Sequence, residues 1–150
     1  MNQGLDREAS IALAKHIKSK AQKPFDNAYR AVLATQGATY VQGFVAFATL
    51  AGRLYRPVEH AWIELDEKIL DPNLPFLDSS ARELYYFPAQ RLSVKTLKAA
   101  IEEAQEDYPE DEPLPIYGAP PYEYYGDVML GGKDYLNAYE AAEAKCKELS

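Results

Sequence analysis

The chain has 150 residues, a length that favours one domain over two. It contains one cysteine and two histidines, which excludes an internal disulfide, a zinc finger and an iron–sulfur cluster, and we expect no metal site and no cofactor. The net charge of −7 comes from residues 102–112, which hold seven acids and no base, while the rest of the chain balances 16 acids against 16 bases. An acidic chain without a basic stripe argues against nucleic-acid and membrane partners.

Two helices are predicted at the start of the chain. Residues 2–20 repeat apolar side chains at three- and four-residue spacing, which is typical of an amphipathic helix. A second helix over residues 24–36 begins with Pro24, since proline suits the first helical turn, where no backbone N–H is needed. Gly37 follows as a stop signal.

From residue 39 the pattern changes to strands rich in valine, phenylalanine and tyrosine. Gly43, inside the first of them, predicts a bulge or the close approach of another backbone. Pro88 predicts an edge position or a bulge for the last strand, because proline cannot donate a ladder hydrogen bond. The predicted strands cover residues 39–49, 56–65, 68–72 and 84–92, with a loop at 73–81.

Ser93 is a predicted N-cap for a helix that ends near Asp107, and a last helix covers residues 133–149. Residues 108–132 contain five prolines and are expected to be irregular. Their tyrosine-rich part, residues 117–125, either covers the core or forms a recognition loop. We therefore predict a single α+β domain over residues 1–150, with helices packed on an antiparallel sheet of about four strands.

One group of residues in the predicted sheet has the composition of a catalytic site. Alternation along the strand puts His60 and Trp62 on the same face. A two-residue hairpin loop places Leu65 opposite Lys68. Trp62 then lies opposite Asp71, one diagonal step from His60 and within side-chain reach. A histidine oriented by a carboxylate is the base half of a nucleophilic triad, although a simple structural pair is the alternative.

Four strings within residues 23–92 resemble motifs of transglutaminase-like proteins, part of the papain-like cysteine-peptidase superfamily. In that family the histidine strand often reads H-A-W and the aspartate strand D-P-T, and small bacterial members have C-aromatic-x-N-A and Y-V-E-G stretches. The resemblance implies a cysteine nucleophile at a helix N-terminus, packed against a sheet that supplies histidine and aspartate, and an acyl-enzyme mechanism. The matching strings are His60-Ala61-Trp62, Asp71-Pro72-Asn73, Pro24-Phe25-Asp26-Asn27-Ala28 and Tyr40-Val41-Gln42-Gly43.

The chain departs from the family pattern at the nucleophile. Pro24 stands where the resemblance places the cysteine, and Gln42 replaces a glutamate. The sole thiol, Cys146, lies on an apolar helix stripe, where a free cysteine usually packs as a small hydrophobe. Ser19 lies a few residues before the second helix but belongs to no motif, and Asp26 is better placed to cap that helix.

We therefore expect a catalytically inactive member of this family, with His60 and Asp71 as triad remnants, that binds a peptide, protein or small molecule. A hydrolase or acyl transferase with an unidentified nucleophile and a structural or assembly protein are the alternatives. No apolar stretch reaches 18 residues and the N-terminus is polar, so a cytoplasmic monomer or homodimer is expected. The residues expected to bind the ligand are Trp62, Tyr40, Gln42, Phe25 and Asn27.

Overall fold

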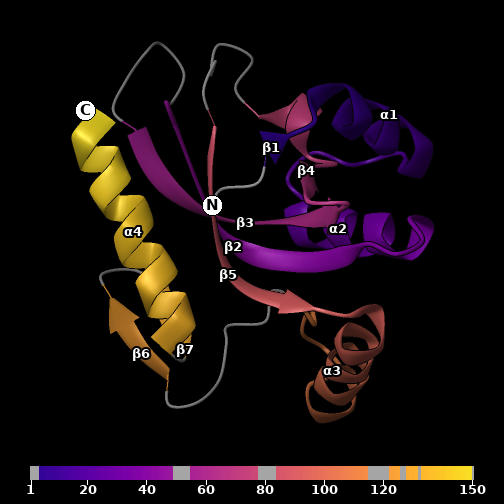
Figure 1. Ribbon diagram of the computed structural model, residues 1–150. Coiled ribbons are helices and arrows are strands. Elements are labelled where there is room, and N and C mark those ends of the chain that lie inside the picture. The colour runs from indigo at the N-terminus through magenta and orange to yellow at the C-terminus, as the bar shows by residue number, and fades with distance from the viewer. Residues whose placement is uncertain are drawn as a thin grey trace. The chain divides into compact units, whose positions relative to one another are not determined.

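A computed structural model describes residues 4–48, 55–77, 84–114, 122–125, 128–131 and 133–149 (Figure 1). These residues form an α+β fold, as predicted, with four α-helices and a five-stranded sheet. The helices are α1 (Arg7–Ile17), α2 (Pro24–Ala34), α3 (Val94–Asp107) and α4 (Lys133–Leu149). The strands are β1 (Gly4–Leu5), β2 (Thr39–Ala48), β3 (Tyr55–Leu65), β4 (Lys68–Leu70), β5 (Tyr85–Leu92), β6 (Tyr122–Tyr125) and β7 (Val128–Gly131), with a 3-10 turn, η2, at Leu74–Phe76.

The main sheet has the strand order β1-β4-β3-β2-β5 and is mixed but mostly antiparallel. Its parallel pair is β1 with β4, which adds a fifth strand to the four that the sequence predicts. The edge position of β5 confirms the prediction from Pro88, because an edge strand tolerates a residue without an N–H group.

The hairpin between β3 and β4 has the predicted two-residue loop. Leu65 pairs with Lys68 in an antiparallel register. The loop residues Asp66 and Glu67 both have positive φ angles, of 52° and 65°, as a type I′ turn requires. This register is the one that the predicted site needs, because a one-residue slip would turn Asp71 to the other face of the sheet.

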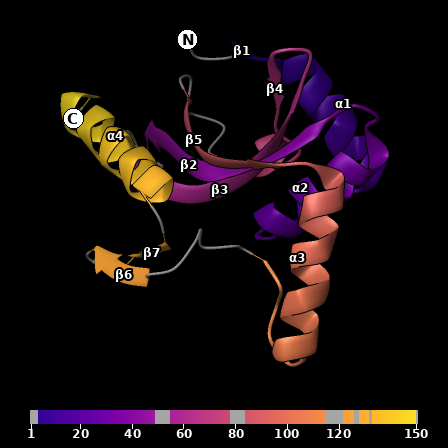
Figure 2. The same ribbon diagram turned by 60° about the horizontal axis from the view of Figure 1, so that its bottom comes forward.

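Side-chain caps set the beginnings of two helices. Asp6 accepts a hydrogen bond from the backbone N–H of Ala9, so α1 begins at Arg7 and not at residue 2 as predicted. The residues before Asp6 instead pair with β4 as β1. Ser93 caps α3 as predicted and accepts from the N–H of Thr96. From there α3 follows directly on β5 (Figure 2).

The described chain groups into two compact units. The first comprises residues 1–41, 61–76 and 91–116. Helices α1 and α2 pack against each other within it. Its core combines the buried faces of α1, α2 and α3 with residues of β2, β3 and β4 and with Ala38, which directly precedes β2. The core residues are Leu13, Ala28, Ala31, Val32, Ala38, Tyr40, Ala61, Ile63, Leu70, Leu97 and Ile101.

The second unit comprises residues 42–60, 77–90 and 117–150. Its core packs α4 on β2 and is formed by Phe44, Tyr135, Ala138 and Ala142. The ring of Phe44 meets that of Tyr135 edge to face, with 5.8 Å between the centroids. Gly43 confirms the predicted close approach, since a Cβ atom there would lie 2.2 Å from the carbonyl oxygen of Phe87.

The proline-rich region after α3 differs in part from the prediction of irregular structure. Strands β6 and β7 pair antiparallel, from Tyr122 with Gly131 to Tyr125 with Val128. Helix α4 packs against β7 and has the predicted bounds (Figure 1). Residues 117–121 and the side chains of β6 lie outside the described residues, so the choice between a core cover and a recognition loop stays a prediction.

Candidate functional site

The β3–β4 hairpin positions the two predicted triad remnants. His60 is buried in β3, with 3% of its surface exposed, and it belongs to the second unit. Asp71 is buried just after β4 in the first unit. Continuing the observed register by one pair sets Asp71 opposite Trp62, as predicted. The interaction of Asp71 with His60 stays a prediction.

The chain around Asp71 is held by hydrogen bonds from both sides. Its backbone N–H donates to the hydroxyl of Ser10, at 2.9 Å, and that hydroxyl donates to the carbonyl of Asp6. One carboxylate oxygen of Asp71 accepts from the backbone N–H of Asn73, at 2.8 Å. A carboxylate that turns back on the chain two residues later forms an Asx turn, which fixes the direction of the loop after β4.

Asn73 and Asn27 tie this loop to the start of α2. The amide nitrogen of Asn27 donates to the side-chain oxygen of Asn73 at 2.7 Å and to the carbonyl of Lys20 at 2.7 Å. Asn73 in turn donates to the carbonyls of Ala61 and Pro24, at 3.2 and 3.3 Å. Both asparagine side chains are buried, so each bond stabilises polar groups that would otherwise lose water. The network therefore fixes the N-terminus of α2 against β3.

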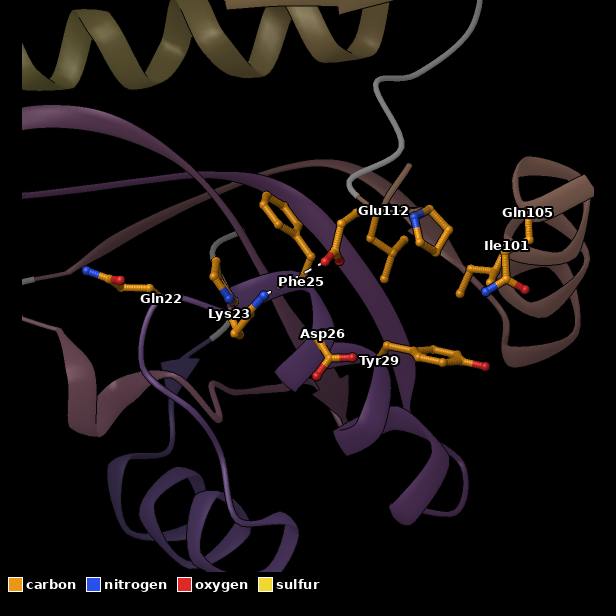
Figure 3. A pocket seen from close by; sticks show the side chains of 11 residues that line it. Gln22, Lys23, Phe25, Asp26, Tyr29, Ile101, Gln105 and Glu112 are labelled. Atoms are coloured by element: carbon orange, nitrogen blue, oxygen red, sulfur yellow. Dashed lines mark ion pairs between the residues drawn. The ribbon is translucent and has the colours of Figure 1, made fainter. Parts of the chain in front are cut away.

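A pocket of about 520 Å³ opens beside that N-terminus, within the first unit (Figure 3). Its volume falls in the range of small-molecule sites, about 300–1,000 Å³. Residues of α2 form one side, α3 contributes Ile101 and Gln105, and the chain after α3 closes it. The lining residues are Gln22, Lys23, Pro24, Phe25, Asp26, Tyr29, Ile101, Gln105, Glu112, Pro113 and Leu114.

Pro24 is the first helical residue of α2, and its equivalence to the nucleophile position of the family stays a prediction. A thiol at a helix N-terminus gains from the positive end of the helix dipole, whereas proline offers no nucleophilic atom. Among the described residues that line the pocket, none is cysteine, serine, threonine or histidine. The described lining therefore provides contacts for a ligand, without the thiol or hydroxyl nucleophile of a cysteine, serine or threonine.

Of the five residues expected to bind a ligand, Phe25 lines this pocket. The other four are fully buried in the structure. Tyr40 belongs to the core of the first unit, and Gln42 donates a hydrogen bond to the hydroxyl of Tyr135 in the second. Their contact with a ligand stays a prediction. The four buried residues are Asn27, Tyr40, Gln42 and Trp62.

The two alternative nucleophiles lie in unfavourable surroundings. The hydroxyl of Ser19 is buried and has no hydrogen-bond partner among the described residues, so no base there accepts its proton. The thiol of Cys146 is buried in α4, and burial together with the nearby carboxylate of Glu143 raises its pKa. A raised pKa reduces the thiolate fraction, which is the reactive form.

The sequence does not single out Glu59, yet the structure gives it unusual electrostatics. The hydroxyl of Tyr135 donates to its carboxylate at 3.1 Å and accepts from the amide of Gln42. The pKa of Glu59 is raised to about 7. Burial is the larger cause and raises the pKa, and the hydrogen bond from Tyr135 offsets part of that rise. Because Tyr135 is 76 residues away, strand alternation near His60 could not reveal this partner.

Comparisons with protein-family models, curated proteins and solved structures found no match. Within the described residues, no group of three or more histidine, cysteine, aspartate or glutamate side chains is arranged to hold a metal ion. In the same residues, no helix has both the length and the apolar character to cross a membrane.

Proposed function

We propose that this protein is a ligand-binding domain of the transglutaminase-like and papain-like kind, in which Pro24 replaces the nucleophile. The pocket beside Pro24 is the proposed binding site. The observation behind this proposal is that Pro24, the first residue of α2, lines a pocket whose described lining residues include no cysteine, serine or threonine. In this proposal His60 and Asp71 are remnants of the triad.

The chemistry of the pocket supports binding. Apolar surface comes from residues such as Phe25, Tyr29 and Leu114. The polar and charged lining residues are Gln22, Lys23, Asp26, Gln105 and Glu112. A concave apolar site with a few polar groups is the usual form of a small-molecule site. The buried asparagine pair stabilises the α2 side of the pocket, so little ordering is needed when a ligand binds.

A thiol introduced at the proposed site tests this function. The probe is N-phenyl-1-naphthylamine, a neutral dye whose fluorescence rises in apolar surroundings. We expect the wild-type protein and the Pro24→Cys variant to bind the dye. After alkylation of the variant with N-cyclohexylmaleimide, the added ring fills the pocket, and we expect dye binding to be lost.

The wild-type protein treated with the same maleimide is the matched control, because its single thiol, Cys146, is buried outside the pocket. Dye binding that survives alkylation of the Pro24→Cys variant would refute the proposed site, and so would a wild-type protein that binds no dye. Turnover of p-nitrophenyl acetate by the wild-type protein would favour a hydrolase instead.

A further inference from the structure

We propose that the natural occupant of the Pro24 pocket is a basic peptide segment, rich in lysine or arginine, that inserts one apolar side chain. This inference rests on the proposed binding function and adds the class of partner. It follows from three features of the first unit: the apolar residues that line the pocket, the acidic stretch that contributes Glu112 to the lining, and an internal ion pair between two lining residues.

The floor of the pocket fits a single large apolar side chain. Phe25 and Tyr29 project from successive turns of α2, and Ile101 faces them from α3. Pro113 and Leu114 complete the apolar surface from the chain after α3. An aromatic or aliphatic side chain of a ligand that enters the pocket would contact these apolar residues and lose most of its contact with water. Anchor residues at protein interfaces bind in this way.

The wall of the pocket is part of the most acidic stretch of the chain. Gln105 and Glu112 line the pocket, and six further acids lie within or beside the segment between them. All of these acids are exposed, and no base occurs in residues 102–112. Exposed charges of one sign raise the local concentration of oppositely charged ligands. The six acids are Glu102, Glu103, Glu106, Asp107, Glu110 and Asp111.

A cation from the protein itself already pairs with the acid that lines the pocket. The ammonium of Lys23 lies 3.8 Å from the carboxylate of Glu112, and the two side chains point toward one another beside Phe25 (Figure 3). Their side chains are 54% and 79% exposed. An ion pair this exposed contributes little stability, so a cationic side chain of a ligand can displace Lys23. The pair marks where such a side chain binds.

The second acid in the pocket is less available to a ligand. The carboxylate of Asp26 lies 3.2 Å from the guanidinium of Arg30, one turn further along α2. Arg30 also donates to the side chain of Asn27, which ties it to the buried network. The carboxylate that a ligand cation meets is therefore that of Glu112, which belongs to the acidic stretch of residues 102–112.

The test uses a fluorescein-labelled peptide in which lysines flank one phenylalanine, with binding followed by fluorescence anisotropy. We expect the wild-type protein to bind it at about 0.1 M salt and more weakly at about 1 M salt, as the Debye length falls from about 10 Å to about 3 Å. Replacing the phenylalanine of the peptide by alanine should weaken binding, and so should replacing its lysines by glutamates.

Two variants of the ion pair should have opposite effects. Glu112→Gln removes the carboxylate that binds the ligand and should weaken peptide binding roughly twofold to fivefold. Lys23→Gln removes the competing internal cation and should strengthen it by a similar factor. A purely structural role of the pair would make both variants bind more weakly. Glu140→Gln, an exposed change on α4 in the other unit, is the matched control and should leave binding unchanged.

The outcomes separate this inference from the proposed function. If the neutral dye binds but the basic peptide does not, or if spermidine competes as well as the peptide does, the inference about the partner is wrong and the binding site stands. If neither dye nor peptide binds, both fail. Equal effects of Glu112→Gln and Lys23→Gln in the same direction would also overturn the basic-peptide assignment.

Discussion

Burial gives the side chain of Glu59 an unusual protonation equilibrium. Its pKa rises from an ordinary value of 4.5 to about 7, so the folded protein prefers the neutral acid. An acid whose pKa is raised on folding contributes stability that is fully present below pH 4.5 and is lost as the pH rises through 7. Full loss corresponds to about 3 kcal/mol, and partial exposure of the carboxylate reduces this to roughly 1–3 kcal/mol.

The Glu59→Gln variant tests this expectation. Glutamine stays neutral and still accepts the hydrogen bond from Tyr135. The wild-type protein should lose roughly 1–3 kcal/mol of stability between pH 5 and pH 8, and the variant should lose most of this decline. Urea unfolding at a series of pH values measures the effect. The Glu140→Gln variant, at an exposed position, should keep the wild-type pH dependence. An unchanged pH profile for Glu59→Gln would show that this carboxylate titrates normally.

Individual residues differ in how well the sequence predicts their environment. Gly43 and Pro88 are predicted correctly, because the lack of a side chain and the lack of an N–H group limit where each fits in a sheet. Glu59 is missed because its pKa depends on Tyr135, which approaches only in the folded chain. Local chemistry can be predicted from the sequence, but a buried electrostatic environment cannot.

At the scale of elements, the buried asparagine pair connects the start of α2 with the loop after β4. Asn27→Ala and Asn73→Ala should each lower the free energy of unfolding by roughly 1–3 kcal/mol, because each leaves buried polar groups without partners. The double variant should lose less than the two single losses added together, by roughly 0.5–3 kcal/mol, since each single variant already breaks their shared bond.

Urea unfolding of the four proteins in this cycle gives the coupling energy. Asn137→Ala is the matched control, because Asn137 is exposed on α4 and its loss should change stability by less than about 0.5 kcal/mol. Strictly additive losses from Asn27→Ala and Asn73→Ala would mean that the two amides do not interact in solution.

Elements with a long periodic pattern or a clear cap are the ones that the sequence predicts well. The predicted limits of α4 agree with the structure, and Ser93 caps α3 as expected. Strand β1 is missed because two residues show no period. The β6–β7 pair is missed because prolines and glycines around it suggested irregular chain. The register of the β3–β4 hairpin is predicted correctly, because a two-residue loop at Asp66 and Glu67 pairs Leu65 with Lys68 and thereby fixes every other pair.

The pocket illustrates what sequence patterns do not contain. Two residues that the sequence analysis singles out, Pro24 and Phe25, line the α2 side of the pocket. The opposite side comes from α3 and from residues 112–114, which share no motif with α2 and lie far along the chain. Their meeting depends on how α2 and α3 pack on the same core, and packing between distant elements leaves no periodic signal in a single sequence.

At the scale of the whole molecule, three strands are common to both compact units. The boundary between the units falls within β2, β3 and β5, after residues 41, 60 and 90. The chain therefore passes from one unit to the other in the middle of each of these strands, and a strand that loses its extended conformation in one unit is expected to lose it in the other as well. We therefore expect the chain to unfold in a single cooperative transition.

Gly43→Ala tests this cooperativity, because it perturbs the second unit alone. The added Cβ atom would lie 2.2 Å from the carbonyl oxygen of Phe87 and 2.8 Å from the N of Ala89, both backbone atoms of β5. The strand must shift, and we expect a loss of roughly 1–3 kcal/mol or more. Gly4→Ala is the matched control, since nothing lies within 4 Å of a Cβ atom at that position.

Two natural probes report on the two units during urea unfolding. The fluorescence of Trp62, the single tryptophan, reports on the first unit, and the reactivity of the single thiol, Cys146, reports on the second. Both side chains are buried in the folded protein. In a cooperative protein, Gly43→Ala lowers the urea midpoint of both probes by the same amount. A variant in which Cys146 becomes reactive at a lower urea concentration while the Trp62 transition keeps its wild-type midpoint would show that the two units unfold independently in spite of their shared strands.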